Sequence, residues 1–172
     1  MALELNGTTG VSLVQDGVVT AADLASGAIT SAALPTDSVL QVVNATYSTG
    51  TSSSSNVFID TGLAATITPT SATSKILIFA NMSGCEKSTN NTYHLFQLFR
   101  DSTSILSFES QLNYTGNSSR TTASSGTNYL DSPSTTSAVT YKVQFASGSN
   151  NAVVIVQASG GHSTITLMEI AG

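Results

Sequence analysis

Side chains that could act in catalysis are few in this sequence. His94 and His162 are the only histidines, and Cys85 is the only cysteine. A Ser or Cys nucleophile needs a neighbouring base, usually histidine. Because the chain has 28 serines, some serine will lie near either histidine by chance. His94 alternates with the apolar Phe96, so we expect a packed histidine in a strand, whereas His162 follows two glycines and is expected in an exposed turn.

Acidic and metal-binding patterns are equally sparse. Glycoside hydrolysis needs two carboxylates at a controlled separation, but most of the ten acidic residues occupy turn or cap positions. A pair formed across a subunit boundary stays open. Calcium-loop and paired-thiol zinc spacings are absent, as is a phosphate-binding glycine-rich loop, and we expect Cys85 to be an inert thiol. We therefore predict no enzyme, no catalytic, metal-binding or cofactor-binding residues, and no cofactor.

The composition excludes several classes of partner. Only 9% of the 172 residues are charged, against roughly 25% in an average soluble domain, and 28 serines and 25 threonines fill the difference. A net charge of −5 with only five Lys and Arg residues argues against nucleic-acid binding, which needs clustered cations. Apolar runs stay short of the ~18 residues of a membrane span, and the N-terminus lacks the pattern of a signal peptide. We predict no nucleic-acid partner and no membrane insertion.

An N-terminal segment, residues 1–37, contains a repeat of ten residues. Residues 16–25 and 26–35 share the pattern Gly-x-Val/Ile-Thr-x-Ala-x-Leu. Its apolar residues cannot be buried by so short a segment, so we expect them to meet the same segment of other copies around a shared axis. The open alternative is a pair of short helices packed on the main domain. The candidate trimer-interface residues are Val19, Leu24, Ile29 and Leu34.

The remaining residues, 38–172, show a period of two that is typical of strands. A hydrophobic content of 40% is enough for one core, and the connections are rich in Gly, Ser, Asn and Pro. The pattern predicts an all-β fold, an antiparallel β-sandwich or jelly-roll-like domain. The expected strands are Val39–Tyr47, Val57–Thr68, Lys75–Ser83, Tyr93–Arg100, Ser104–Gln111, Ala138–Ala146, Ala152–Ala158 and Ser163–Ile170.

Alternation within these strands predicts which faces are buried. Val139, Tyr141, Val143 and Phe145 are expected to face the core. The strand Lys75–Ser83 is apolar on both faces, which is typical of a central strand that a partner covers.

Surface loops are the expected place of binding. The stretch Gln111–Asn128 is the most loop-like part of the domain and contains Tyr114, and Tyr129 lies just beyond it. Tyrosine offers an apolar ring with a polar tip, so Tyr114 and Tyr129 are candidate receptor-contact residues. The open alternative is that these loops only cover the surface.

Several segments resemble bacteriophage tail-fibre and related virion-surface proteins. They include residues 5–13, the repeat within 16–34, residues 129–133 and 139–142, and the C-terminal run at 165–170. The resemblance implies an intertwined homotrimer, with the repeats around the axis and the β domains forming a knob. Tail fibres usually carry an attachment domain and a long shaft, for which 172 residues leave no room.

We therefore expect a structural protein of a phage virion, assembled in the host cytoplasm. It would be a trimeric short fibre or knob on the particle surface, contacting a host-surface glycan, and its other partners would be a tail adaptor or the capsid. The alternative is a trimeric capsid decoration protein that stabilises the head. A less favoured alternative is a tail-associated glycan hydrolase.

Overall fold

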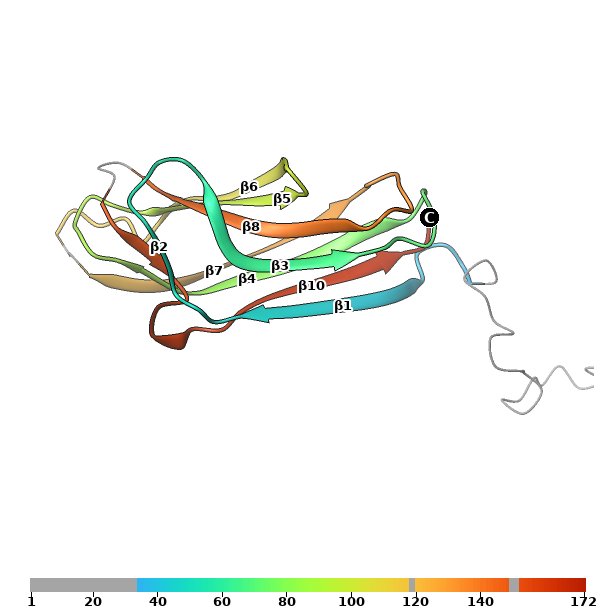
Figure 1. Ribbon diagram of the computed structural model, residues 1–172, viewed down its shortest axis with the longest axis horizontal. Coiled ribbons are helices and arrows are strands. Elements are labelled where there is room, and N and C mark those ends of the chain that lie inside the picture. The colour runs from blue at the N-terminus through green and yellow to red at the C-terminus, as the bar shows by residue number, and fades with distance from the viewer. Residues whose placement is uncertain (1–33, 118–119, 149–151) are drawn as a thin grey trace, which may run out of the picture. The chain divides into compact units, whose positions relative to one another are not determined.

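The described chain is a sandwich of two antiparallel sheets. A computed structural model describes residues 34–117, 120–148 and 152–172, and residues 35–172 form one compact unit. Its regular elements are strands, apart from a single 3-10 turn at Ala158–Gly160. The predicted all-β, antiparallel sandwich is therefore confirmed (Figure 1). The N-terminal repeat lies outside the described residues, so the intertwined homotrimer stays a prediction.

Six strands form one sheet and four form the other. The six-stranded sheet has the order β1-β10-β4-β9-β2, and β7 pairs with β4 beside that path; the four-stranded sheet has the order β3-β8-β5-β6. In the first sheet the bounds are β1 Val39–Tyr47, β2 Thr51–Ser53, β4 Lys75–Lys87, β7 Thr121–Asp131, β9 Val154–Val156 and β10 Ser163–Ile170. In the second they are β3 Ile59–Ile67, β5 His94–Arg100, β6 Thr103–Leu112 and β8 Val139–Ser147.

The core lies between the two sheets and follows the predicted alternation. All four inward residues predicted on β8 are buried, and Phe145 packs against Phe96 of β5 with ring centroids 6.5 Å apart. Ile76, Ile78 and Met82 of β4 contribute the facing layer and are fully buried. Successive side chains of a strand point to opposite faces, so Leu77 and Phe79 of β4, which alternate with these buried residues, point away from the core.

A buried polar group also links the two sheets. Asp131 of β7 accepts a hydrogen bond of 2.7 Å from the Tyr141 hydroxyl of β8. It also forms an ion pair with Arg100 of β5 at 3.0 Å. Burial, followed by the neighbouring Asp131, raises the pKa of Tyr141, so this phenol keeps its proton and donates. The carboxylate therefore holds β7 to the opposite sheet.

The prediction of a loop over residues 111–128 is wrong for most of its length. Residues 121–131 form β7, which pairs with β4 over nearly its whole length. The strand has few large apolar residues, and its exposed positions carry Thr122, Ser124 and Gly126, which resemble loop composition. Its period-two alternation, with Ala123 and Tyr129 on the inner side, was the available signal.

The strands give residues 35–172 two distinct ends, which we call proximal and distal. Residues 35–38 and the C-terminus meet at the proximal end, where Asp37 donates its backbone N–H to Ala171 at 2.8 Å and Ala171 donates to Ser38 at 2.9 Å (Figure 1). The turns of residues 88–93 and 113–117 lie at the opposite, distal end. The chain therefore enters the sandwich at one end and presents its β4–β5 and β6–β7 connections at the other.

Gly62 tests the packing of the β3 bulge against β1. Gly62 has a φ of +87°, and a Cβ there would overlap the Tyr47 ring, whereas Gly160 has a φ of +75° with nothing within 4 Å of the added atom. Both Gly62→Ala and Gly160→Ala should lose about 1 kcal/mol to the left-handed backbone. We expect Gly62→Ala to lose about 1–3 kcal/mol more through overpacking, measured by urea unfolding. Equal losses at the two positions would contradict this account.

Candidate functional site

An apolar stripe crosses the outer face of the six-stranded sheet. Strands β1, β10, β4 and β7 lie side by side, and their register aligns four outward side chains in one row. Val42 is 56% exposed and Leu130 48% exposed at the two ends of the row, with half-buried residues between them. We define the apolar stripe as this row: Val42, Met168, Leu77 and Leu130.

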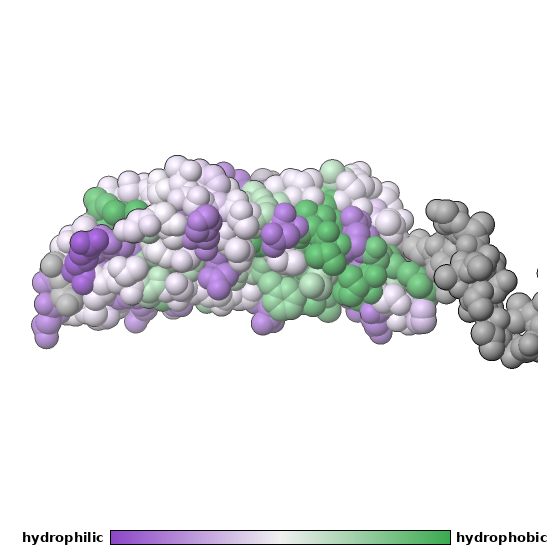
Figure 2. All heavy atoms as spheres, turned by 90° about the horizontal axis from the view of Figure 1, so that it is seen from below, coloured by the Kyte–Doolittle hydropathy of each residue, from purple (hydrophilic) through white to green (hydrophobic). Residues whose placement is uncertain are grey.

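The apolar surface continues from the stripe toward the proximal end. Ile170 pairs with Val39 on one side and with Lys75 on the other, and Val39 is 51% exposed. Figure 2 shows the hydrophobic surface of this side gathered in the half nearer the proximal end. Because contiguous exposed apolar surface marks interaction sites far better than single apolar residues do, this half of the face is the strongest candidate for a binding surface.

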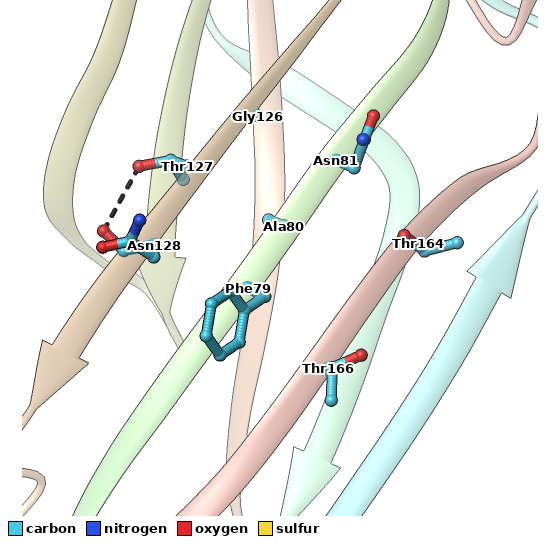
Figure 3. Close-up of a pocket in the computed structure, with 8 residues that line it drawn as sticks. All are labelled: Phe79, Ala80, Asn81, Gly126, Thr127, Asn128, Thr164 and Thr166. Atoms are coloured by element: carbon cyan, nitrogen blue, oxygen red, sulfur yellow. Dashed lines mark hydrogen bonds between the residues drawn. The ribbon is translucent and has the colours of Figure 1, made fainter.

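In the next two rows toward the distal end, polar side chains surround the single ring of Phe79 and border a shallow hollow. Phe79 of β4 lies between Thr166 of β10 and Asn128 of β7 in the register, and Asn81 of β4 lies opposite Gly126 of β7. Since Gly126 has no side chain, space of about 300 Å³ remains open beside the Phe79 ring (Figure 3). An exposed ring flanked by amides and hydroxyls can offer both apolar and hydrogen-bonding contact.

The outer face of the four-stranded sheet has a different chemistry. Asp60 of β3 accepts hydrogen bonds from Lys142 at 3.0 Å and from Gln144 at 2.7 Å on β8, and Thr66 and Thr140 are hydrogen-bonded at 2.8 Å. These polar side chains bind one another across the strands. The apolar stripe thus lies on the six-stranded sheet, whereas the outer face of β3 and β8 in the four-stranded sheet carries these polar side chains.

A loop cluster at the distal end presents tyrosine to solvent. Tyr114 is 50% exposed, its hydroxyl donates to Asn91 Oδ1 at 3.4 Å, and its ring meets Tyr93 edge-on with centroids 5.9 Å apart. The two loops are tied together, because Asn91 donates its backbone N–H to the Thr115 carbonyl at 2.9 Å and the buried Lys87 ammonium donates to the same carbonyl at 3.2 Å. The exposed ring is therefore held by an ordered base.

The predicted contact and interface residues fall in different places. Tyr114 is exposed at the distal end, whereas Tyr129 points inward from β7 and packs against the core. Leu34 is 39% exposed at the start of the described chain. The other three interface candidates, at positions 19, 24 and 29, lie outside the described residues.

Two of the three candidate reactive side chains, His94 and Cys85, are buried in the sandwich. His94 is fully buried, stacks on Phe96 at 5.7 Å and has Nε2 3.0 Å from the Ile155 carbonyl, and burial lowers its pKa. Cys85 is also fully buried, and burial raises its pKa to about 12, so it is a protonated thiol at neutral pH. His162 is exposed, as expected.

Among residues 34–117, 120–148 and 152–172, no cluster of three or more His, Cys, Asp or Glu side chains could hold a metal ion. Within the same ranges no helix has the length and apolarity to cross a membrane. The carboxylates of Asp60, Glu86 and Asp131 are each engaged in an ion pair.

None of the residues of the apolar stripe was expected to be functional from the sequence alone. The signal was present in one strand, since residues 75–83 are apolar on both faces and were expected to meet a partner. The stripe itself depends on register, because β1, β4, β7 and β10 come from distant parts of the sequence. No pattern within a single strand shows that their apolar residues align.

Comparison with known proteins finds a likeness in structure and none in sequence. No protein-family model matches the sequence, and no curated protein matches it. The fold is similar to that of the VP2 subviral particle of infectious bursal disease virus, with a TM-score of 0.46 and 12% identity over 78% of this chain. This chain spans only 41% of the VP2 chain.

The buried carboxylate of Glu169 in β10 holds together chain segments near the proximal end. It is buried and accepts hydrogen bonds from Gln41 Nε2 at 2.6 Å and from the Thr70 backbone N–H at 2.7 Å. Burial alone would raise the pKa of Glu169, but these hydrogen bonds outweigh it and hold the pKa below its usual value. A carboxyl group whose pKa is lower in the folded state than in the unfolded state stabilises the fold. This stabilisation is fully present above the unfolded pKa of about 4.3 and is lost as the pH falls through the folded pKa.

We therefore expect Glu169→Gln to be less stable than the natural protein at pH 7, by about 1–3 kcal/mol. Its free energy of unfolding should also fall less steeply than that of the natural protein as the pH drops below about 4.5. Urea titrations at a series of pH values measure both. Thr70→Ala, which keeps the carboxylate but removes one hydroxyl donor, should give an intermediate effect. Parallel stability curves for Glu169→Gln and the natural protein would refute this role.

Proposed function

We propose that the protein is a homotrimeric structural protein of a bacteriophage particle, displayed on the virion as a short fibre or knob that contacts a host-surface glycan. The observation that supports this most is the division of the sandwich into two ends. The chain enters at the proximal end, and the ordered Tyr114 cluster stands at the distal end. Such an arrangement suits a module that is anchored at one end and makes contact at the other.

The proximal end suits anchoring because a segment that carries an apolar repeat leads into it. Residues 1–37 contain the ten-residue repeat, whose apolar side chains need neighbouring copies for burial. Three such segments around one axis would hold three sandwiches side by side, with their distal ends pointing the same way. The remaining part of each segment would bind a tail adaptor or the capsid.

The distal end suits a neutral ligand such as a sugar. Tyr114 supplies an exposed ring, and Asn91 supplies an amide beside it; rings and amides are the groups that contact sugar faces and hydroxyls. Three of the five cationic residues are held in ion pairs, and Lys87 is buried. Little free positive charge is therefore available to attract an anionic ligand.

The first test is where the protein lies in the virion and in how many copies. We expect an antibody against the protein to decorate the tail of intact particles, and quantitative mass spectrometry to give a copy number that is a small multiple of three. Labelling over the head, with hundreds of copies, would replace this proposal with the capsid decoration protein. Absence from purified particles would refute both.

The second test removes the exposed ring. Tyr114→Ala should weaken binding of the purified protein to host cells by about tenfold, since an aromatic contact residue contributes on the order of 1–2 kcal/mol. Thr136→Ala, at an exposed position in a proximal connection, is the control and should bind normally. Binding by titration of labelled protein, with and without enzymatic removal of surface glycans, measures the effect. If the two variants bind equally well, the distal cluster is not the contact site.

A further inference from the structure

The apolar stripe runs without a break across four strands of the outer face. Its four residues are neighbours in the strand register, and Phe79, at 44% exposure, extends the row toward the distal end. The opposite sheet has its outer polar groups satisfied within the chain. An exposed apolar row that crosses four strands of one sheet face indicates that another surface covers it.

We propose that this surface is a second copy of the same chain, so that the outer face of the six-stranded sheet lines the axis of the homotrimer. The inference rests on the trimer of the proposed function and specifies which face of the sandwich it buries. It adds a second interface to the one expected from residues 1–37. The partner of the stripe is then neither a foreign protein nor the ligand at the distal end.

The charge distribution favours a copy of the same chain. On a three-fold axis each side chain meets its own equivalents, so a charged residue there would face two like charges in a poorly hydrated space. The stripe and the two rows beyond it carry no charged side chain, and Lys75 borders only the proximal margin. Glu169 lies between Met168 and Ile170 in sequence, but its carboxylate is buried and bound to Gln41.

The point at which the chain enters also favours this arrangement. Residues 1–33 precede Leu34, and the described chain passes from Leu34 to Val39 at the margin of the apolar half of the face. Segments that wind together on one axis must bring the proximal ends of their sandwiches close to that axis. The half of the face nearest to this end is the apolar half (Figure 2), which is the half that close packing would bury.

The test compares two valines of similar exposure in the full-length protein. Val42 lies in the stripe at 56% exposure, and Val57 lies between β2 and β3 at 66% exposure. We expect Val42→Glu to raise the dissociation constant of the trimer by on the order of a hundredfold or more, because three carboxylates would lose water near one another. Val57→Glu should remain trimeric. Analytical ultracentrifugation measures the assembly state, and far-ultraviolet circular dichroism verifies the fold.

A labelling experiment tests the same face without disturbing assembly. Val42→Cys and Val57→Cys are treated with a thiol reagent, and the buried Cys85 serves as the unreactive background. If the stripe is covered, Cys at 42 should react about tenfold or more slowly than Cys at 57, because it must wait for the interface to open. Dilution to the monomer should remove the difference.

The outcomes separate the inference from the proposed function. A trimer that tolerates Val42→Glu and labels equally at both positions overturns the inference and leaves the trimer standing. A full-length protein that sediments as a monomer refutes the trimer of the proposed function, whether or not position 42 is protected. Protection at position 42 in that monomer would assign the stripe to residues 1–33 of the same chain and so overturn the inference as well.

Discussion

The double pairing of β4 is the constraint on which the rest of the structure depends. β10 pairs with one edge of β4 and β7 with the other, and its inner side chains enter the core. A strand bonded along both edges can present only its faces to further structure. The inner face of β4 meets β8 and β5 across the sandwich, whereas Leu77 and Phe79 on the outer face have no layer above them within residues 34–172. The unpartnered face is thus a consequence of where this strand lies.

Much of the fold follows from the spacing of apolar residues, because period-two alternation fixes both the element and its buried face. The predicted bounds of β1 and β10 agree with the structure, and the inner residues of β8 are those expected. β7 escaped prediction because strand formation there comes from pairing with β4 and not from its own hydrophobicity. Serine and glycine do not favour strands by themselves, and the threonines of β7 are too few to mark the whole segment as a strand.

The site was less predictable than the fold, for a physical reason. Tyr114 lies in a local turn, so the loop-like composition of the sequence around it was enough to suggest an exposed contact residue. The apolar stripe is a non-local property, since Val42 and Leu130 are brought into one row only through Met168 and Leu77. Single exposed valines or leucines are ordinary at protein surfaces. Only their alignment across four strands distinguishes this face from the rest of the surface.

Low charge and abundant hydroxyls are consistent with these same requirements. A sheet with a core on one face and a neighbouring copy on the other has no place for charges near the axis, yet its strands still need side chains that favour extended backbone. Threonine meets both needs, since it is β-branched, uncharged and able to bond locally: Thr166 accepts from Asn44 on the face itself. Several of the few charges are held in ion pairs, as with Asp60 and Lys142 on the opposite sheet. The 9% charge content is therefore what a chain would show if most of its surfaces met neutral partners, of which its own copies are the nearest.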